Sequence, residues 1–117
     1  MNEQGAFCII YGNTIRNRIL EYLLENKGLD FAVGDMAREL KVSRPKAYEV
    51  IKEFESKHYI MKSRVIGKTQ LYILNKESKI IQFFLKSFSE CLKLVVEAYE
   101  GKGIKAMLGK AQTVKVH

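Results

Sequence analysis

The chain has 117 residues, which is the size of one domain, and its 47% apolar content suffices for a single modest core. Lysine and arginine number 20 against 13 acidic residues, so the formal net charge is +7. This balance suits a polyanionic partner such as nucleic acid, although charge alone also fits solubility or binding at a membrane surface. A membrane-spanning helix is excluded, because no uncharged stretch approaches the roughly 20 residues that cross a bilayer.

The N-terminal segment, residues 1–12, fits either a short helix or a strand packed on a partner. Its apolar run at 6–11 is short and lacks a basic leader, so we expect no signal peptide. Cys8 and Cys91 belong to no CxxC or Cys/His cluster, which argues against a zinc site. We expect two buried thiols and a reducing, cytoplasmic setting, with a disulfide as the alternative.

A helix is predicted over residues 13–27, where apolar residues recur at helical spacing. Asn13 is suited to cap its N-terminus, and Gly28 is suited to end it with a positive φ. The partly alternating residues 29–33 then favour a brief strand. The apolar positions of the helix are Ile15, Ile19, Leu20, Leu23 and Leu24.

Two further helices are predicted next, over about residues 34–40 and 43–57. Ser43 offers a side-chain oxygen to cap the second of them, and Pro45 sits in its first turn, where the missing N–H costs little. The residues expected to face the core are Met36, Ala37 and Leu40 in the first helix and Ala47, Val50, Ile51 and Phe54 in the second.

Residues 59–74 are rich in good strand formers and contain the turn signal Gly67-Lys68, so they predict a hairpin. Its register stays open, because Lys62 and Arg64 do not alternate cleanly with the apolar positions.

Asn75 is suited to cap a long helix over residues 76–100, which Gly101 and Gly103 end. This helix carries two apolar faces, so we predict that one docks on its own domain and the other pairs with a second chain. The alternative is one broad face buried within a monomer. We assign dimerisation to the heptad-spaced set Ile81, Phe84, Phe88, Cys91, Val95 and Ala98, and the second set is Ile80, Leu85, Leu92, Val96 and Tyr99.

The tail at 101–117 is basic, and it suits an extension of a nucleic-acid contact, a crossing to a partner subunit or a solvated end. We therefore divide the chain into an N-terminal extension (1–12), a central domain (13–75), a C-terminal dimerisation helix (76–100) and this basic tail.

The segment from Val33 to Ile51 resembles the helix-turn-helix signature, because small, turn and apolar residues recur at its fixed offsets. With the hairpin that follows, residues 13–74 resemble the winged helix of the MarR, ArsR and related archaeal and bacterial regulators. The resemblance implies an α+β, mainly α fold: a winged helix-turn-helix with an added long C-terminal helix. One departure is Lys41, which stands where the turn usually has glycine and costs about 1 kcal/mol in a left-handed conformation.

The resemblance makes the helix that begins after Ser43 the recognition helix, which enters the major groove of DNA. Arg44 then suits a guanine, and Tyr48 suits a thymine methyl or a phosphate, unless it packs on a neighbouring loop. Glu49 either pairs with a neighbouring lysine or discourages wrong bases, and we favour the pairing. The predicted DNA-binding residues are Ser43, Arg44, Pro45, Lys46, Tyr48, Glu49 and Lys52 on the helix and Lys62, Arg64 and Lys68 on or near the hairpin.

The sequence carries no nucleophile elbow, phosphate loop, metal cluster or paired-carboxylate signature, so we expect neither an enzyme, nor a cofactor, nor a metal site. The function we expect is sequence-specific binding of double-stranded DNA by a homodimer that regulates transcription. The alternatives are a winged-helix module for protein–protein interaction, which would normally be poorer in lysine, and an architectural DNA-binding protein without sequence choice.

Overall fold

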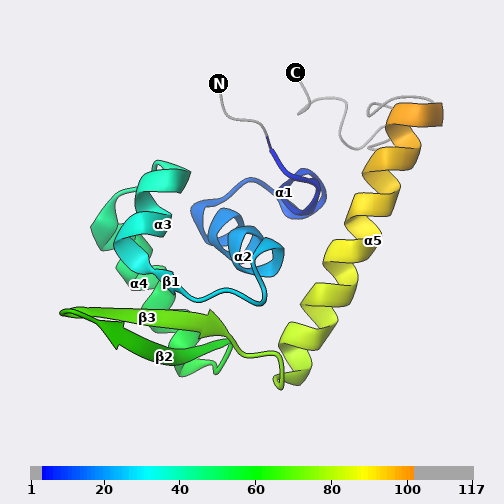
Figure 1. Cartoon of the computed structure of the whole chain (residues 1–117). Helices are drawn as coiled ribbons and strands as arrows, with labels where there is room; N and C mark the ends of the chain where they lie inside the picture. The colour runs from blue at the N-terminus through cyan, green and yellow to red at the C-terminus, as the bar shows by residue number, and fades with distance from the viewer. Residues whose placement is uncertain (1–3, 102–117) are drawn as a thin grey trace.

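The computed structural model describes residues 4–101, and the predictions made for the tail beyond Gly101 lie outside the described residues. Figure 1 shows α1 lying between α2 and the long α5, with the β2–β3 hairpin at the end of the molecule away from α1. In chain order the elements are α1 (Ala6–Tyr11), α2 (Ile15–Glu25), β1 (Phe31–Ala32), α3 (Val33–Leu40), α4 (Arg44–Ser56), β2 (Ile60–Ile66), β3 (Thr69–Leu74) and α5 (Lys79–Gly101).

The predicted first helix is present as α2, but its two ends differ from the prediction. Thr14, not Asn13, caps it, because the Thr14 hydroxyl accepts the backbone N–H of Asn17 at 3.0 Å. The helix ends at Glu25, and Gly28 does not have the positive φ expected of it, although Gly12 and Gly67 do. The capping oxygen therefore comes from the residue next to the predicted one.

The helix-turn-helix has the predicted form. Lys41 adopts the left-handed conformation (φ 59°, ψ 43°), and the N–H of Val42 reaches back to the carbonyl of Ala37 at 3.0 Å. Ser43 then caps α4 by accepting the backbone N–H of Lys46 at 3.3 Å, with Pro45 in the first turn. The turn between α3 and α4 is consequently closed by backbone hydrogen bonds, despite a side chain at the left-handed position.

The three strands form one antiparallel sheet in the order β1-β3-β2, which confirms the brief strand and the hairpin. The register that the sequence left open is interrupted by a bulge. Lys62 pairs with Tyr72 and Val65 with Gln70, so the two residues between Lys62 and Val65 face a single residue of β3. The hairpin turn includes Gly67, whose φ of 62° favours glycine.

The core is a single cluster of buried side chains to which every helix contributes, α1 included. The ring of Phe7 on α1 packs edge-on against Phe84 on α5, with ring centroids 6.3 Å apart. The backbone N–H of Phe7 is accepted by the buried carboxylate of Glu21 at 3.0 Å. The N-terminal segment is thus a helix packed into the core of its own chain.

Helix α5 begins later than predicted, at Lys79. Ser78 provides its cap, accepting the N–H of Ile81 at 3.2 Å, whereas the side chain of Asn75 accepts the N–H of Glu77 in a tight turn before the helix. No helix within residues 4–101 combines the length and the apolar character needed to cross a membrane.

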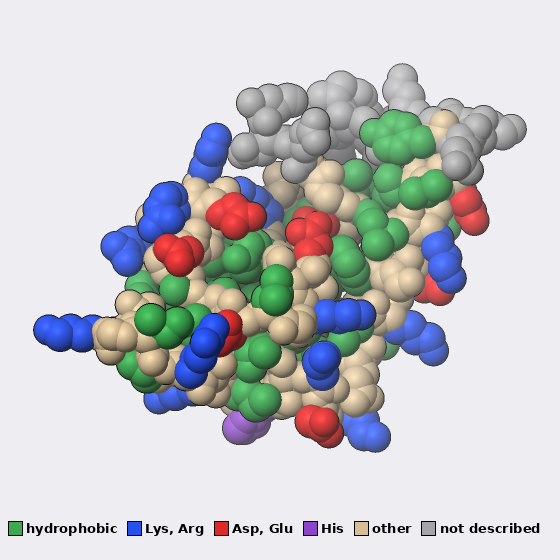
Figure 2. Space-filling model, in the orientation of Figure 1, with side chains coloured by type: hydrophobic (Ala, Val, Ile, Leu, Met, Phe, Trp, Pro, Cys, Tyr) green, Lys and Arg blue, Asp and Glu red, His purple; other side chains and the backbone are tan. Residues whose placement is uncertain are grey.

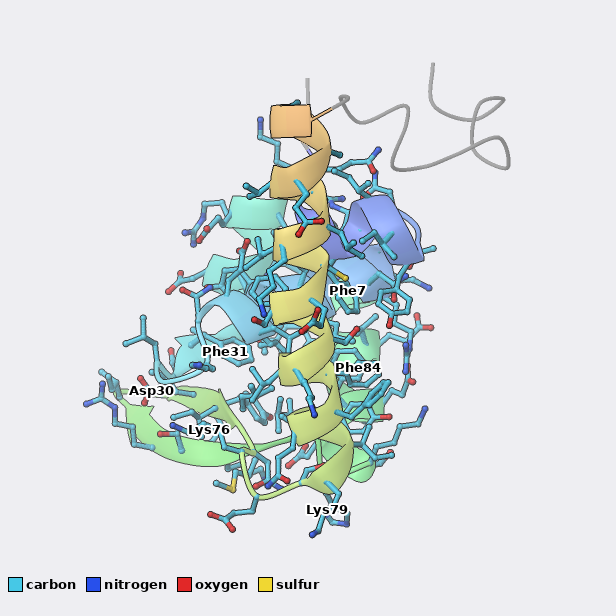
Figure 3. All side chains as sticks on the ribbon, turned by 90° about the vertical axis from the view of Figure 1, so that its right-hand side faces the viewer. Phe7, Asp30, Phe31, Lys76, Lys79 and Phe84 are labelled. Atoms are coloured by element: carbon cyan, nitrogen blue, oxygen red, sulfur yellow. The ribbon has the colours of Figure 1, made fainter. Side chains whose placement is uncertain are left out.

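The face of α5 that we assigned to dimerisation packs on its own chain instead, which corrects the assignment. Ile81 is 0% exposed and Cys91 3% exposed, both within the core cluster. The whole assigned set is buried or partly buried inside the chain: Ile81, Phe84, Phe88, Cys91, Val95 and Ala98. Figure 3 looks onto α5 and shows Phe84 and Phe7 behind the helix, on the side of the core.

The apolar side chains of α5 that remain exposed lie on the two flanks of this inner face. The helical repeat of 3.6 residues places Leu92, Val96 and Tyr99 along one flank and Ile80, Phe83 and Leu94 along the other, all exposed. Leu85, on the first flank, is partly buried. The second set predicted from the sequence is therefore the one that mostly faces outward.

Candidate nucleic-acid interface

The exposed side of α4 is the centre of the candidate site. Its opposite side anchors the helix, since Ala47 and Phe54 are completely buried in the core. All the predicted contact residues of the recognition helix are exposed: Ser43, Arg44, Pro45, Lys46, Tyr48, Glu49 and Lys52. The residues predicted for the hairpin, Lys62, Arg64 and Lys68, are exposed as well. The helix therefore presents the face that the sequence predicts.

The charges on this face are only partly compensated. Lys46 and Glu49 form an ion pair at 3.4 Å, which confirms the local pairing expected for Glu49. Across the described part of the chain, four predicted contacts form no ion pair with an acidic residue: Arg44 and Lys52 on the helix and Lys62 and Lys68 on the hairpin. These uncompensated cations are the ones able to neutralise phosphates or to donate to bases without first losing a partner.

The guanidinium of Arg44 lies against the first turn of α3. A Cβ built on Gly34 would collide with Nη2 of Arg44, so glycine leaves the space that this side chain occupies. Arg44 thus lies over the start of the neighbouring helix and remains exposed to solvent.

A groove of about 370 Å³ separates the recognition helix from the hairpin. Burial, with a smaller contribution from Glu55, raises the pKa of Tyr72, so this phenol stays protonated and is a hydrogen-bond donor near neutral pH. The groove is polar, and its charged walls are the cations Arg44 and Lys68 and the carboxylate of Asp35. The remaining walls include Gly34, Tyr48, Gln70 and Tyr72. Such a surface is chemically suited to a backbone that carries phosphates.

The hairpin itself extends away from the core, and its turn carries Lys68 directly after Gly67. Figure 2 shows Lys and Arg side chains projecting at this end of the molecule, whereas apolar side chains are exposed along the upper part of α5. The strand β2 also exposes apolar side chains, namely Met61, Val65 and Ile66.

Arg64 differs from the other predicted contacts because its charge is already paired. Its Nε donates to Oδ2 of Asp30 at 2.8 Å, and the hydroxyl of Ser63 donates to the same oxygen at 2.8 Å. These hydrogen bonds, that from Arg64 first, hold the pKa of Asp30 below its usual value. Asp30 was not predicted from the sequence, since nothing in its local pattern links it to a residue 34 positions later.

A second cavity, of about 490 Å³, is lined by acidic residues of α2 and α3 that include Glu21, Glu25 and Glu39. Burial, followed by the neighbouring Glu21 carboxylate, raises the pKa of the Cys8 thiol to about 12, so Cys8 is an unreactive thiol. Both cysteines are buried and free, as expected. Among residues 4–101 no group of His, Cys, Asp and Glu side chains is arranged to hold a metal ion.

This arrangement of α2, β1, α3, α4 and the β2–β3 hairpin is a winged helix-turn-helix, to which α1 and the long α5 are added. No family model matches the chain, and no curated protein matches it in sequence. Several solved structures do match it in fold.

The transcriptional regulator HlyU from Vibrio vulnificus is 19% identical, with a TM-score of 0.53, over 67% of this chain and 75% of HlyU. A mutant of ZitR from Lactococcus lactis is 18% identical with a TM-score of 0.58, over 79% of this chain but 61% of ZitR. The adhesin competence repressor AdcR from Streptococcus pyogenes is 12% identical with a TM-score of 0.58, over 87% of this chain and 75% of AdcR. At these identities the likeness establishes the winged-helix fold; none of the three is described as an enzyme.

Proposed function

We propose that this protein binds double-stranded DNA in a sequence-specific manner and regulates transcription as a homodimer in a reducing, cytoplasmic compartment. The observation that carries the proposal is the exposed face of α4, where Arg44 and Lys52 form no ion pair with any acidic residue in the described part of the chain. Lys62 and Lys68 on the wing are likewise exposed and unpaired within residues 4–101. The wing is the β2–β3 hairpin. The two buried thiols fit a reducing compartment.

In this function the N-terminal half of α4 enters the major groove, because side chains in the first turns of a recognition helix reach the base edges. Arg44, in the first turn, donates to O6 and N7 of a guanine, and Tyr48 follows one turn later on the same side. Lys68 reaches a phosphate beside the wing, and such a contact positions the protein without reading sequence.

A homodimer presents two copies of α4 to half-sites about 34 Å apart, one turn of the duplex. The inner face of α5 is occupied within the chain, so pairing would use one of its two exposed flanks. We assign pairing to the flank formed by Leu92, Val96 and Tyr99. Exposed apolar side chains aligned along a helix commonly mark an interface between subunits.

The test is to select bound duplexes from a random pool and then to measure affinity for the selected duplex against a scrambled one over a range of salt concentrations. The expected result is an enriched (pseudo)palindrome that binds more tightly than the scrambled duplex. Binding to neither duplex would overturn the proposal in favour of a protein–protein module, and equal binding to both would make the protein an architectural one.

Two variants assign the roles on the selected duplex. Arg44→Ala is expected to relax base preference at one position of each half-site. Lys68→Ala should weaken selected and scrambled duplexes alike and lower the log–log salt slope by about 1.8, because the dimer loses one phosphate contact in each subunit. Lys86→Ala is the matched control, because this exposed lysine lies on α5. If Arg44→Ala and Lys68→Ala bind like the control, the DNA-contacting face has been misassigned.

A further inference from the structure

We propose that Asp30 is the residue that positions the wing, and that Arg64 serves as its clamp partner and does not contact a phosphate. The clamp is defined as Asp30, Ser63 and Arg64. That the clamp fixes the wing is argued from the contacts within the protein alone. Only the effect of Arg64 on DNA affinity rests on the proposed function.

The contacts of the clamp converge on one carboxylate. Asp30 precedes β1 directly, and its Oδ2 accepts from both Ser63 Oγ and Arg64 Nε at 2.8 Å, while Arg64 Nη2 lies 3.4 Å from Oδ1. The Asp30 side chain is 17% exposed although that of Arg64 is 65% exposed. The acceptor is thus seated against the sheet, and the donors reach it from the wing; Figure 3 shows Asp30 beside the hairpin.

The two donors are the residues of the bulge in β2. Ser63 and Arg64 are the pair that lies between Lys62 and Val65, opposite a single residue of β3. The side chain of Gln70 also donates to the backbone carbonyl of Arg64 at 3.2 Å. A bulge bends its strand and changes the direction of the residues after it, so fixing this bulge fixes the course of the wing toward its turn.

The clamp also joins the two edges of the sheet. Asp30 belongs to the segment that leads into β1, and β1 and β2 lie on opposite sides of β3. A strand of two residues contributes few ladder hydrogen bonds, so the ion pair across β3 adds a tie that β1 alone does not supply. We therefore assign to Asp30 the role of fixing the angle between the wing and the recognition helix.

The charge balance separates Arg64 from Lys68. A phosphate that bound Arg64 would have to displace a carboxylate that already holds it by two hydrogen bonds. Lys68 has no such partner among the described residues, so it can contact a phosphate without breaking an ion pair. The clamp consequently predicts that Arg64 affects affinity through the shape of the wing and leaves the number of neutralised phosphates unchanged.

The first arm of the test measures amide hydrogen exchange of the full chain without DNA. Asp30→Asn and Arg64→Ala are each expected to raise exchange across residues 62–71 about tenfold, the factor that one charged hydrogen bond typically contributes to local opening. Ser63→Ala, a milder variant that keeps the ion pair, raises it less, and Lys68→Ala leaves it unchanged. Exchange that stays at the wild-type level in Asp30→Asn, Ser63→Ala and Arg64→Ala would overturn the clamp.

The second arm measures the salt dependence of binding to the selected duplex. Arg64→Ala is expected to weaken binding with the wild-type log–log slope, whereas Lys68→Ala lowers the slope by about 1.8, or about 0.9 for each subunit of the dimer. A slope lowered by Arg64→Ala as much as by Lys68→Ala would overturn the assignment of Arg64. If the wild-type protein binds no duplex, the proposed function fails, and the exchange measurement still decides whether the clamp exists.

Discussion

The guanidinium of Arg16 on α2 donates two hydrogen bonds to a single carboxylate oxygen of Glu53 on α4, from Nε at 2.9 Å and from Nη2 at 2.7 Å. Lys57 donates to the same oxygen at 2.9 Å, and the guanidinium also lies 5.1 Å from the ring centre of Phe54. Together these contacts fasten the far half of the recognition helix to α2, so that its N-terminal half is presented on a fixed support.

This ion pair predicts a loss of stability in acid. The hydrogen bonds from Arg16 and then Lys57 lower the pKa of Glu53 from 4.5 to about 2. Because the folded pKa is the lower one, the stabilisation is complete above about pH 4.5 and disappears as the pH falls through about 2. Glu53→Gln should therefore lower the free energy of unfolding near neutral pH but leave it almost unchanged near pH 2.

The expected size is about 0.5–1 kcal/mol near neutral pH, because the side chain of Glu53 is 34% exposed and solvent screens the pair. Urea unfolding over a pH series measures it. Glu49→Gln is the matched control, since this carboxylate is 70% exposed and, among the described residues, pairs only with Lys46. A loss of the same size at both ends of the pH range would show that the charge of Glu53 is not its source.

Two adjacent residues of α5 test which of its faces belongs to the core. Ile81 is 0% exposed and Ile80 50% exposed. Ile81→Ala should cost about 2–5 kcal/mol, through lost burial and the cavity left behind. Ile80→Ala should cost no more than about 0.5 kcal/mol. Denaturant unfolding measures both values, and equal losses would contradict the placement of α5.

The left-handed residues give a prediction in the opposite direction. Lys41 and His58 have φ values of 59° and 62°, in which a side chain is strained. Lys41→Gly and His58→Gly should each raise the free energy of unfolding by about 0.5–1 kcal/mol, once the greater freedom of glycine in the unfolded chain is subtracted.

Lys27→Gly is the control for these glycine variants, because Lys27 lies in a turn without a positive φ. It should lower stability slightly, since glycine then increases the entropy of the unfolded chain and relieves no strain. Thermal unfolding distinguishes the three proteins. A destabilised Lys41→Gly would mean that its side chain contributes more than its conformation costs.

The proposed dimer gives a prediction about mass in solution. Leu92→Glu places a charge on the exposed flank of α5 and should convert the dimer to a monomer at micromolar concentration, measured by sedimentation equilibrium. Gln82→Glu introduces the same charge at an exposed polar position ten residues earlier on the helix, away from this flank, and should leave the dimer intact. A wild-type monomer at that concentration, or a dimer of Leu92→Glu, would contradict the proposed flank.

The helix-turn-helix was predictable because its determinants are local. Ser43, Pro45 and the apolar stripe ending at Phe54 lie within about three turns of chain, and each acts on its immediate neighbours. The errors at helix starts are also local. Thr14 caps α2 one position after the predicted Asn13, and Ser78 caps α5 three positions after the predicted Asn75.

The two faces of α5 were visible in the sequence, but which of them is buried was not. The choice depends on α1, whose short apolar run left open whether it forms a helix or a strand packed on a partner, and on the contact of its Phe7 ring with Phe84. The clamp at Asp30 was equally inaccessible, because the bulge in β2 changes which side chains of the wing point toward β1. Both features follow from tertiary packing and not from local pattern.

Helix α1 touches both α2 and α5, and its hydroxyl at Tyr11 also bonds Ser87 of α5 at 2.7 Å. In a dimer that pairs through α5, the two recognition helices would therefore be held by continuous helix packing, with no flexible loop between the dimer interface and α4. The distance between the two copies of α4 would then be fixed. If one base pair were inserted between the two half-sites, only one copy of α4 could bind its half-site.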